Sequence, residues 1–285
     1  MGIILFLFGA AVGSFLNVVA LRYDPDKFLF DKRVIGGRSH CPYCHKTLRW
    51  YELVPVLSFV IQKGKCRRCR ASLNFQYPAA ELAAGFLAVW IPIVVKSHLA
   101  LTPEANIYVI SALWVLVAWI FLLLALVDIR LHLIPDELNV LLIILGIALP
   151  VLTPVSPLGN ASFMGAYSLM FGLGDTVWTS RLLAALFGLA FLGILIALTK
   201  GRGMGLGDLK LAVVLGLLFG WPDIVLILFL AFVIGSAVAL LLVGFGKQHM
   251  KGKMAFGPYM ALASLLVFAW GEKILAGYFS LFGII

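Results

Sequence analysis

Two aspartates in this sequence stand where an acidic side chain has a chemical use. Asp128 ends an apolar run, and Asp208 ends a Gly-Leu-Gly-Asp stretch at 205–208, immediately before another apolar run. A charge in or against a membrane-spanning segment is unfavourable, so acids in such places are functional candidates. Two carboxylates that share one water can hydrolyse an amide, because an ionised one takes a proton from the water while a protonated one polarises the scissile carbonyl. The pair therefore predicts an aspartyl protease.

Each acid also has a simpler explanation. Arg130 could pair with Asp128, and Asp208 could merely cap the helix that follows it. Asp136 follows an Ile-Pro pair and precedes an apolar segment, so we expect it to cap a helix or support the site. A helix N-terminus favours negative charge and a C-terminus disfavours it, so we expect Asp208 to ionise more readily than Asp128.

The four cysteines form a second candidate site, because they occur as two Cys-x-x-Cys pairs. Two residues between cysteines let both sulfurs of a turn reach one ion, and two such turns complete a tetrahedral sulfur shell. Zinc is the expected metal, with iron as an alternative. Disulfides are disfavoured because the positive charge of the surrounding segment places it in the reducing cytosol. A shell closed by sulfur is structural rather than catalytic, and its expected ligands are Cys41, Cys44, Cys66 and Cys69.

The elements that must position these residues are membrane helices. Of the 285 residues, 62% are hydrophobic and only 12% are charged, too few charges to cover a water-soluble globule. A helix needs about 20 apolar residues to cross a bilayer, and it satisfies its own backbone groups in lipid. We expect an all-α integral membrane protein with about eight spans, at 2–21, 79–95, 107–127, 138–152, 182–199, 209–220, 224–245 and 254–272.

The distribution of charge predicts the orientation of these spans. Nearly all Lys and Arg residues fall in 22–78, 128–137, 200–208 and 246–253, and cytoplasmic loops are the ones enriched in these residues. We therefore expect both termini outside, and Asp128 and Asp208 at the cytoplasmic face. The net charge of +9 is explained by this orientation and by attraction to anionic lipid, and it does not indicate a nucleic-acid partner.

Three domains follow from this topology. The first span occupies 1–21, a small cytoplasmic zinc-ribbon-like domain is inserted at 22–78, and a helical membrane domain occupies 79–285. Within the last, we expect 153–178 to form an external loop and 274–285 to lie at the membrane interface.

Short motifs are spread over most of the chain. They are Gly13-Ser14-Phe15-Leu16-Asn17, Cys41-Pro42-x-Cys44, Trp50-Tyr51-Glu52-Leu53, Gly64-Lys65-Cys66-Arg67-x-Cys69, Gln76-Tyr77-Pro78-x-x-Glu81, Asp128 with Ile134-Pro135-Asp136, Gly203-Met204-Gly205-x-Gly207-Asp208-x-Lys210, and Phe256-Gly257-Pro258-Tyr259. In order and spacing the set resembles the bacterial prepilin peptidases, GxGD-type membrane aspartyl proteases that process the precursors of type IV pilins and pseudopilins.

The resemblance implies an inner-membrane enzyme that removes a short basic leader after Gly, on the cytoplasmic side. The substrates would be prepilins or pseudopilins of a type IV pilus or a type II secretion system. The family's catalytic pair falls on Asp128 and Asp208. The residues expected to support this pair are Gly205, Gly207, Asp136 and Lys210.

The resemblance also implies N-methylation of the new N-terminal residue, usually Phe, by S-adenosylmethionine. The segments that the family links to methylation contain Asn17, Glu52 and Glu81, which are therefore candidate cofactor-binding residues. Each has a structural alternative: Asn17 could bond between helices, Glu52 could be a surface charge, and Glu81 could cap the second span. Members that lack methylation usually lack the cysteine loop, and this chain has it.

Two other classes of protein remain open at this point. A small transporter could use Asp128 and Asp208 as proton-relay acids, and it would not need a folded zinc domain. A scaffold of a pilus export machine that has lost catalysis is a third class, against which the intact acids argue. A peptidase without methyltransferase activity is a narrower alternative within the favoured class.

Overall fold

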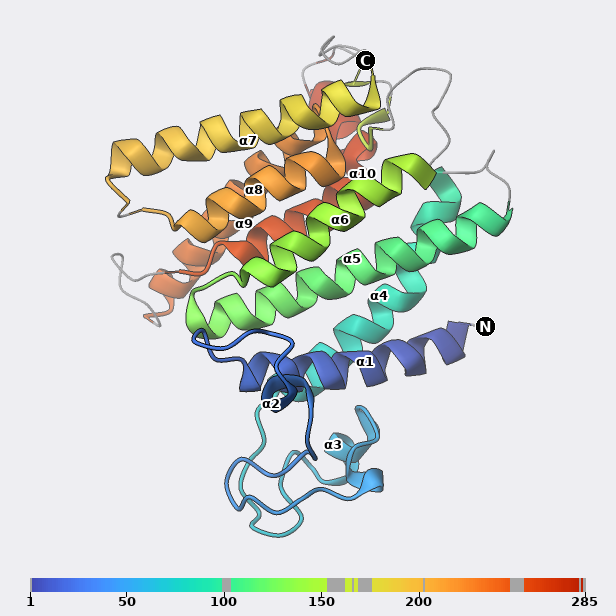
Figure 1. Ribbon diagram of the computed structural model, residues 1–285, viewed down its shortest axis with the longest axis vertical. Coiled ribbons are helices and arrows are strands. Elements are labelled where there is room, and N and C mark those ends of the chain that lie inside the picture. Colours follow the sequence, from blue (N-terminus) through green and yellow to red (C-terminus); the bar gives the residue numbers. More distant parts are fainter. Residues whose placement is uncertain are drawn as a thin grey trace. The chain divides into compact units, whose positions relative to one another are not determined.

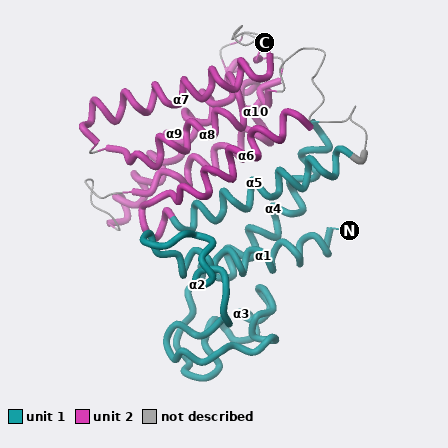
Figure 2. The backbone as a smooth tube through the Cα atoms, in the orientation of Figure 1, with its two compact units in different colours: residues 1–127 teal, residues 128–285 magenta. Residues whose placement is uncertain are grey.

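The structure, a computed structural model, describes residues 2–98, 104–152, 162–165, 167–168, 176–201, 203–246, 254–281 and 283. The chain divides into two compact units, residues 1–127 and 128–285 (Figure 2). The helices are α1 (Gly2–Arg22), α2 (Lys32–Ile35), η1 (Trp50–Glu52), α3 (Leu57–Ile61), α4 (Gln76–His98), α5 (Glu104–Leu131), α6 (Asp136–Leu152), α7 (Val177–Thr199), α8 (Leu206–Phe219), α9 (Asp223–Gly244) and α10 (Gly257–Leu281) (Figure 1).

The all-α membrane class is confirmed. Six of the described helices, α1, α4, α5, α7, α9 and α10, are long and apolar enough to cross a membrane. The other two predicted spans exist as helices, but α6 has 17 residues and α8 has 14. At a rise of 1.5 Å per residue, α8 is only about 21 Å long. The predicted number of eight is therefore slightly too high for helices of full spanning length.

The C-terminal segment is divided near the predicted boundary. We expected a span ending at 272 and a separate apolar segment after it, and α10 consists of two helical parts that meet at a kink at Trp270, where φ is −136° and ψ is 16°. The second part is helical as far as Leu281. Its location at the membrane interface stays a prediction.

Unit 1 is built on a close pair of helices, α1 and α4. A Cβ added at Gly9 would lie 2.7 Å from the carbonyl oxygen of Ala84, and one added at Gly13 would lie 2.6 Å from that of Ala80. Only glycine allows the two backbones to approach this closely, and small residues are what membrane helices place at such contacts. Gly13, part of the first motif, is thus a packing residue.

The insertion between α1 and α4 contains only short helices and two isolated β-bridges. Helix α4 begins at Gln76, three residues before the predicted span at 79–95. The side-chain oxygen of Asn74 accepts a hydrogen bond from the backbone N–H of Gln76 at 2.9 Å, which satisfies a donor at the helix N-terminus.

Unit 2 contains the end of α5 and helices α6 to α10, and α8 contacts α6, α7 and α9 (Figure 1). Glycines again permit the close contacts. A Cβ at Gly216 of α8 would lie 2.5 Å from the backbone nitrogen of Ala185, and one at Gly188 of α7 would lie 2.9 Å from the carbonyl oxygen of Ala212. The helix that carries Asp208 is therefore held tightly by its neighbours.

Most of the predicted external loop at 153–178 lies outside the described residues, but one described turn changes its interpretation. Ser162 and Phe163 pack into unit 2 rather than extending away from it. The Phe163 ring lies 5.7 Å from that of Phe219 and 5.1 Å from that of Phe268, centroid to centroid. This part of the segment is structural.

Candidate active site and metal centre

Asp128 occupies the last turns of α5 and is almost fully buried, with 4% of its surface exposed. Its Oδ2 accepts a hydrogen bond of 2.9 Å from the backbone N–H of Gly257, the first residue of α10. The carboxylate thus lies at the C-terminus of one helix and at the N-terminus of another.

Asp208 lies in the first turn of α8, which is not among the six helices of spanning length. Its Oδ2 accepts a hydrogen bond of 3.2 Å from the backbone N–H of Gly205, the N-cap residue. Asp208 therefore reaches back to the helix terminus from inside the helix, instead of occupying the N-cap as the simpler explanation required. Its second oxygen accepts no hydrogen bond from the described residues.

The structure brings the two predicted acids together within unit 2. Burial raises the pKa of Asp208 to about 6, the N–H of Gly205 opposes this rise, and the charge of Asp128 adds to it. The ion pair of Lys210 with Asp136 and the contact of Gly207 with Ile134 place the first turn of α8 beside the segment that follows Asp128. We expected Asp208 to ionise more readily because it alone lay at a helix N-terminus. In the structure both carboxylates accept an N–H at a helix N-terminus, so this reason no longer distinguishes them.

The glycines beside Asp208 keep space open. Neither Gly205 nor Gly207 has a positive φ, so the backbone does not require glycine there. A Cβ at Gly205 would have as its nearest neighbour Oδ2 of Asp208, 3.7 Å away, and one at Gly207 would lie 3.4 Å from Cβ of Ile134. The absence of a side chain at Gly205 therefore leaves the space beside the Asp208 carboxylate unfilled.

Asp136 and Lys210 form an ion pair between the first turns of α6 and α8. The Lys210 Nζ lies 2.8 Å from each carboxylate oxygen of Asp136, and both side chains are more than half exposed. An exposed pair adds little stability, but it connects the start of α6 to the helix turn that carries Asp208. The prediction of Asp136 as a supporting residue remains a prediction, now with a named partner.

The four cysteines lie together in unit 1. Their Sγ atoms are all within 4.8 Å of one another, and those of Cys41 and Cys69 are 3.8 Å apart. Tetrahedral zinc with bonds of about 2.3 Å gives sulfur–sulfur edges of about 3.8 Å. No disulfide joins these cysteines. The cluster therefore has the donor set and the spacing of a four-thiolate metal site.

The two cysteine turns have the same local structure, which the sequence did not reveal. In each turn, the residue after the second cysteine has a positive φ: 53° at His45 and 57° at Arg70. An isolated β-bridge closes each turn. The backbone N–H groups of Cys69 and Arg68 donate to the sulfur of Cys66 and lower its pKa to about 7. A thiol that ionises near neutral pH is suited to bind a metal.

The three predicted cofactor residues each have a hydrogen-bond partner of their own. Asn17, fully buried, accepts a hydrogen bond of 3.0 Å from Nε2 of Gln76. Glu81, 7% exposed, accepts one of 2.6 Å from the N–H of Val56 and bonds to Ser14. Glu52 accepts one from the N–H of Arg49 at 2.8 Å, within its own turn.

One residue of the site was missed by sequence reasoning. Gly257 belongs to a recognised motif, yet no role was assigned to it, and the structure makes it the hydrogen-bond donor to Asp128. The available signal was its place before a proline at the start of an apolar run, where a helix begins with unsatisfied N–H groups. Such a terminus is a natural partner for a carboxylate.

Comparison with known proteins agrees with this site. A model described as the bacterial peptidase A24 N-terminal domain matches residues 7–95, and one described as the type IV leader peptidase family matches residues 114–240. No solved structure matches the chain.

Relatives with the name prepilin leader peptidase/N-methyltransferase align over nearly the whole chain. The one from Bacillus subtilis (strain 168) is 33% identical over 96% of this chain and 96% of its own length. The one from Aeromonas salmonicida (strain A449) is 30% identical over 97% of this chain and 93% of its own, and that from Pseudomonas aeruginosa is 28% identical over 97% and 93%. With matches of this identity and coverage, the chain belongs to the type IV leader peptidase family.

Proposed function

We propose that this protein is a membrane aspartyl peptidase that removes the leader of prepilins or pseudopilins and then N-methylates the new N-terminus. The observation that carries the peptidase assignment is the neighbouring pair Asp128 and Asp208, each with a single backbone hydrogen bond. The names of the relatives support both activities. A transporter would not account for those relatives.

The reaction follows from the ionisation of the pair. The charge of Asp128 helps to raise the pKa of Asp208 to about 6, so Asp208 is the member of the pair that holds a proton while Asp128 is ionised. Asp128 takes a proton from a water molecule as the water oxygen attacks the scissile carbonyl carbon, while protonated Asp208 donates its proton to the carbonyl oxygen. Collapse of the geminal diol returns a proton to the leaving nitrogen, breaks the C–N bond and releases the new amino terminus.

We place this chemistry at the cytoplasmic membrane face of a bacterial inner membrane, because basic loops stay in the cytoplasm. The leader would approach the open side of Asp208 next to Gly205 and Gly207, where no side chain blocks an extended backbone. The ion pair of Asp136 with Lys210 would hold the first turn of α8 during this approach.

Methylation requires a methyl donor, and S-adenosylmethionine, which supplies an electrophilic methyl group, is the proposed one. Of the candidate residues, Asn17 has the best opportunity to bind a ligand, because its buried Nδ2 has no partner among the described residues. Glu81 and Glu52 already use one carboxylate oxygen on a backbone N–H, so their contribution would come through the remaining oxygen.

Zinc is the ion that we propose for the four cysteines. Its role would be structural, because four thiolates leave no open position. The insertion contains only short helices, so metal binding would supply much of its folding free energy. Metal analysis of purified protein should find stoichiometric zinc, and removal by a chelator should unfold the insertion, seen as new proteolytic cleavage within 22–75. Retained protease resistance without metal would contradict this role.

The proposed activities are tested with purified full-length protein in lipid vesicles. The substrate is a prepilin-like chain with a basic leader, a Gly-Phe junction and an apolar helix, and mass spectrometry reads its new N-terminus. We expect cleavage after Gly with or without S-adenosylmethionine, and the added mass of one methyl group only with it. The Asp128→Asn variant should lose cleavage, while Asp26→Asn, a change at an exposed acid of the insertion, should retain it.

Other results would decide against the proposal. A wild-type protein that leaves the substrate intact would exclude the peptidase. An Asp128→Asn variant that cleaves normally would exclude the pair. Cleavage without any methyl gain would leave a peptidase alone, and proton flux into vesicles without cleavage would favour the transporter.

A further inference from the structure

The short helix α3 of unit 1 presents apolar side chains outward. Leu57, Val60 and Ile61 are 56%, 63% and 59% exposed. Phe59, on the opposite side, packs against Phe75 with ring centroids 6.5 Å apart and over the turn at Gly64. A helix that faced water would carry polar side chains on its outer surface. The outer surface of α3 is therefore better suited to contact with an apolar environment than with water.

A buried carboxylate fixes the position of α3 on α4. Val56, the residue before α3, donates its N–H to Oε2 of Glu81 at 2.6 Å. Val56 has φ 60° and ψ −51°, a tight turn closed by a 2.6 Å hydrogen bond from Leu57 N–H to the Pro55 carbonyl. Such a conformation is unfavourable for a β-branched residue, so it persists only where its surroundings hold it. Glu81 supplies that hold.

This attachment sets the depth of α3 relative to the membrane. Glu81 lies in the second turn of α4, about 7.5 Å along the helix axis from its first residue, Gln76. In Figure 1, α3 lies beneath α1 in the view, opposite the middle of that helix rather than beyond the end from which the chain continues into the insertion. Peptide segments that bind at a bilayer interface bury their apolar side about 5–10 Å into the boundary of headgroups and acyl chains. With the first residue of the candidate span, Gln76, taken as the membrane boundary, the attachment point of α3 falls in this range.

The chain that follows α3 is strongly basic. It carries five exposed cations and no acid, at Lys63, Lys65, Arg67, Arg68 and Arg70. Anionic lipid attracts such a cluster by about 1 kcal/mol for each basic residue near the surface. Apolar side chains next to a basic cluster match the chemistry of an anionic bilayer, with an acyl region beside negative headgroups.

We propose that α3 and the basic segment 63–70 form a lipid-binding surface. This surface inserts Leu57, Val60 and Ile61 into the leaflet at the insertion's end of α1 and α4, and it places the cations among anionic headgroups. The four-cysteine insertion would then contact the bilayer directly through α3, in addition to its covalent connection to the membrane helices α1 and α4. The inference is independent of the proposed peptidase and methyltransferase activities.

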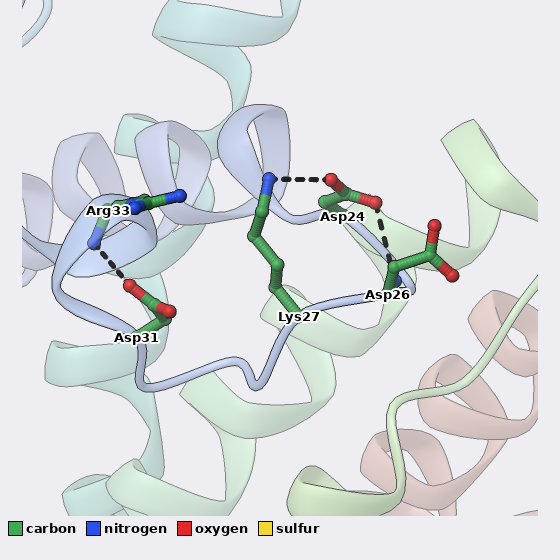
Figure 3. Close-up of polar contacts among 5 residues, drawn as sticks. All are labelled: Asp24, Asp26, Lys27, Asp31 and Arg33. Carbon is green, nitrogen blue, oxygen red and sulfur yellow. Dashed lines mark hydrogen bonds and ion pairs between the residues drawn. The ribbon is translucent and has the colours of Figure 1, made fainter.

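The test uses full-length protein in which a photoreactive benzophenone amino acid replaces Val60 or, separately, Ile61. Both side chains are exposed, so the label does not disturb the packing of Phe59. The matched control carries the label at Asp26, an exposed acid in the segment after α1. Figure 3 shows that the Asp26 carboxylate makes no contact with the other residues drawn, whereas Asp24 binds Lys27 at 2.8 Å and Asp31 binds the Arg33 N–H at 2.8 Å.

Each labelled protein is reconstituted in vesicles of phosphatidylethanolamine and phosphatidylglycerol, irradiated, digested and analysed by mass spectrometry. We expect phospholipid adducts at positions 60 and 61 in several-fold higher yield than at 26. Replacing phosphatidylglycerol by phosphatidylcholine should lower the yield at 60 and 61. Adducts at these positions with a second copy of the chain or with added prepilin-like substrate would overturn the proposal, as would a lipid yield no higher than at position 26.

Discussion

At the N-terminal end of α8, Asp208 and Asp128 each accept one backbone hydrogen bond. At its C-terminal end, Asp223 is fully buried and accepts hydrogen bonds from Ser162 Oγ at 2.8 Å and from the Phe163 N–H at 3.1 Å. Arg181, which interacts electrostatically with Asp223, donates to three carbonyls, those of Gly146, Leu217 and Leu218. The acidic groups at the two ends of α8 thus differ in how fully they are hydrogen-bonded.

This difference in hydrogen bonding distinguishes the Asp208 end, which is suited to chemistry, from the Asp223 end, which is structural. A buried polar group is unfavourable unless it is hydrogen-bonded, and the Asp223 end meets that requirement with partners from α6, α7, α8 and the turn at 162. The Asp208 end does so only in part, which leaves oxygens free to bind water and substrate. Measurements of activity and of stability should therefore respond to substitutions at opposite ends.

The largest expected effect is on activity, at the Asp208 end. Asp208→Asn keeps the shape of the side chain but removes one of the two carboxyl groups that exchange protons with the water and the carbonyl, so the cleavage rate should fall about a thousandfold or more. Thermal unfolding in detergent should be unchanged or shifted upward, because the variant removes the repulsion between Asp208 and Asp128. Cleavage of a prepilin-like substrate and the melting temperature are measured on the same sample.

Asp223→Asn is the matched control, since it makes the same substitution at the other end of α8. It should retain cleavage in the folded protein. If Asp208→Asn lost stability and Asp223→Asn lost activity, the distinction between the two ends would be wrong.

The second effect is on stability, at the Arg181 end. Arg181→Met should lower the free energy of unfolding by about 3 kcal/mol, because it removes hydrogen bonds to three carbonyls and leaves Asp223 buried without a nearby cation. Folded protein should still cleave, since Asp208 lies about 18 Å along α8 from Gly220. Chemical denaturation in micelles measures the loss.

The double variant Arg181→Met with Asp223→Asn sharpens this result. If the charges are coupled, the loss in the double variant will be smaller than the sum of the two single losses. Strict additivity would show that Arg181 acts only through the carbonyls of α6 and α8.

Much of the Asp208 end could be predicted from sequence, and little of the Asp223 end. Asp128 and Asp208 are identifiable because an acid beside an apolar run is unusual, and the cysteine pairs because their spacing is local. Asp223 follows Trp221-Pro222 and looks like a turn residue. Its partner Ser162 is 61 positions away in a segment of ordinary loop composition.

The same physical limit applies to Gly257 and to α3. The contact of Gly257 with Asp128 joins residues 129 positions apart, and no pattern within either segment specifies it. The outward apolar face of α3 spans a single short helix, so hydropathy over a window of spanning length does not detect it. Local spacing predicts which residues can do chemistry, whereas non-local packing determines what holds them.

The third effect concerns pH and tests whether the free oxygens at the Asp208 end titrate during catalysis. Burial, together with the charge of Asp128, raises the pKa of Asp208 to about 6, and Asp208 must hold a proton in order to donate it. The value of kcat/KM should therefore be higher at pH 6 than at pH 8 and should fall about tenfold for each pH unit well above 6. A profile that stays flat up to pH 8.5 would show that the reaction does not need the proton on Asp208.

The smallest effect is expected at the ion pair beside the site, between Lys210 and Asp136. Both side chains are more than half exposed, so Lys210→Met should lower the free energy of unfolding by less than about 1 kcal/mol. Salt screens exposed charges, so high salt should produce the same small loss in the wild type and none in the variant. Asp136→Asn is the matched control and should behave in the same way. A loss of unfolding free energy as large as that of Arg181→Met would mean that the start of α8 depends on this ion pair for its stability. The Asp208 end would then be stabilised by buried-type polar contacts, as the Asp223 end is.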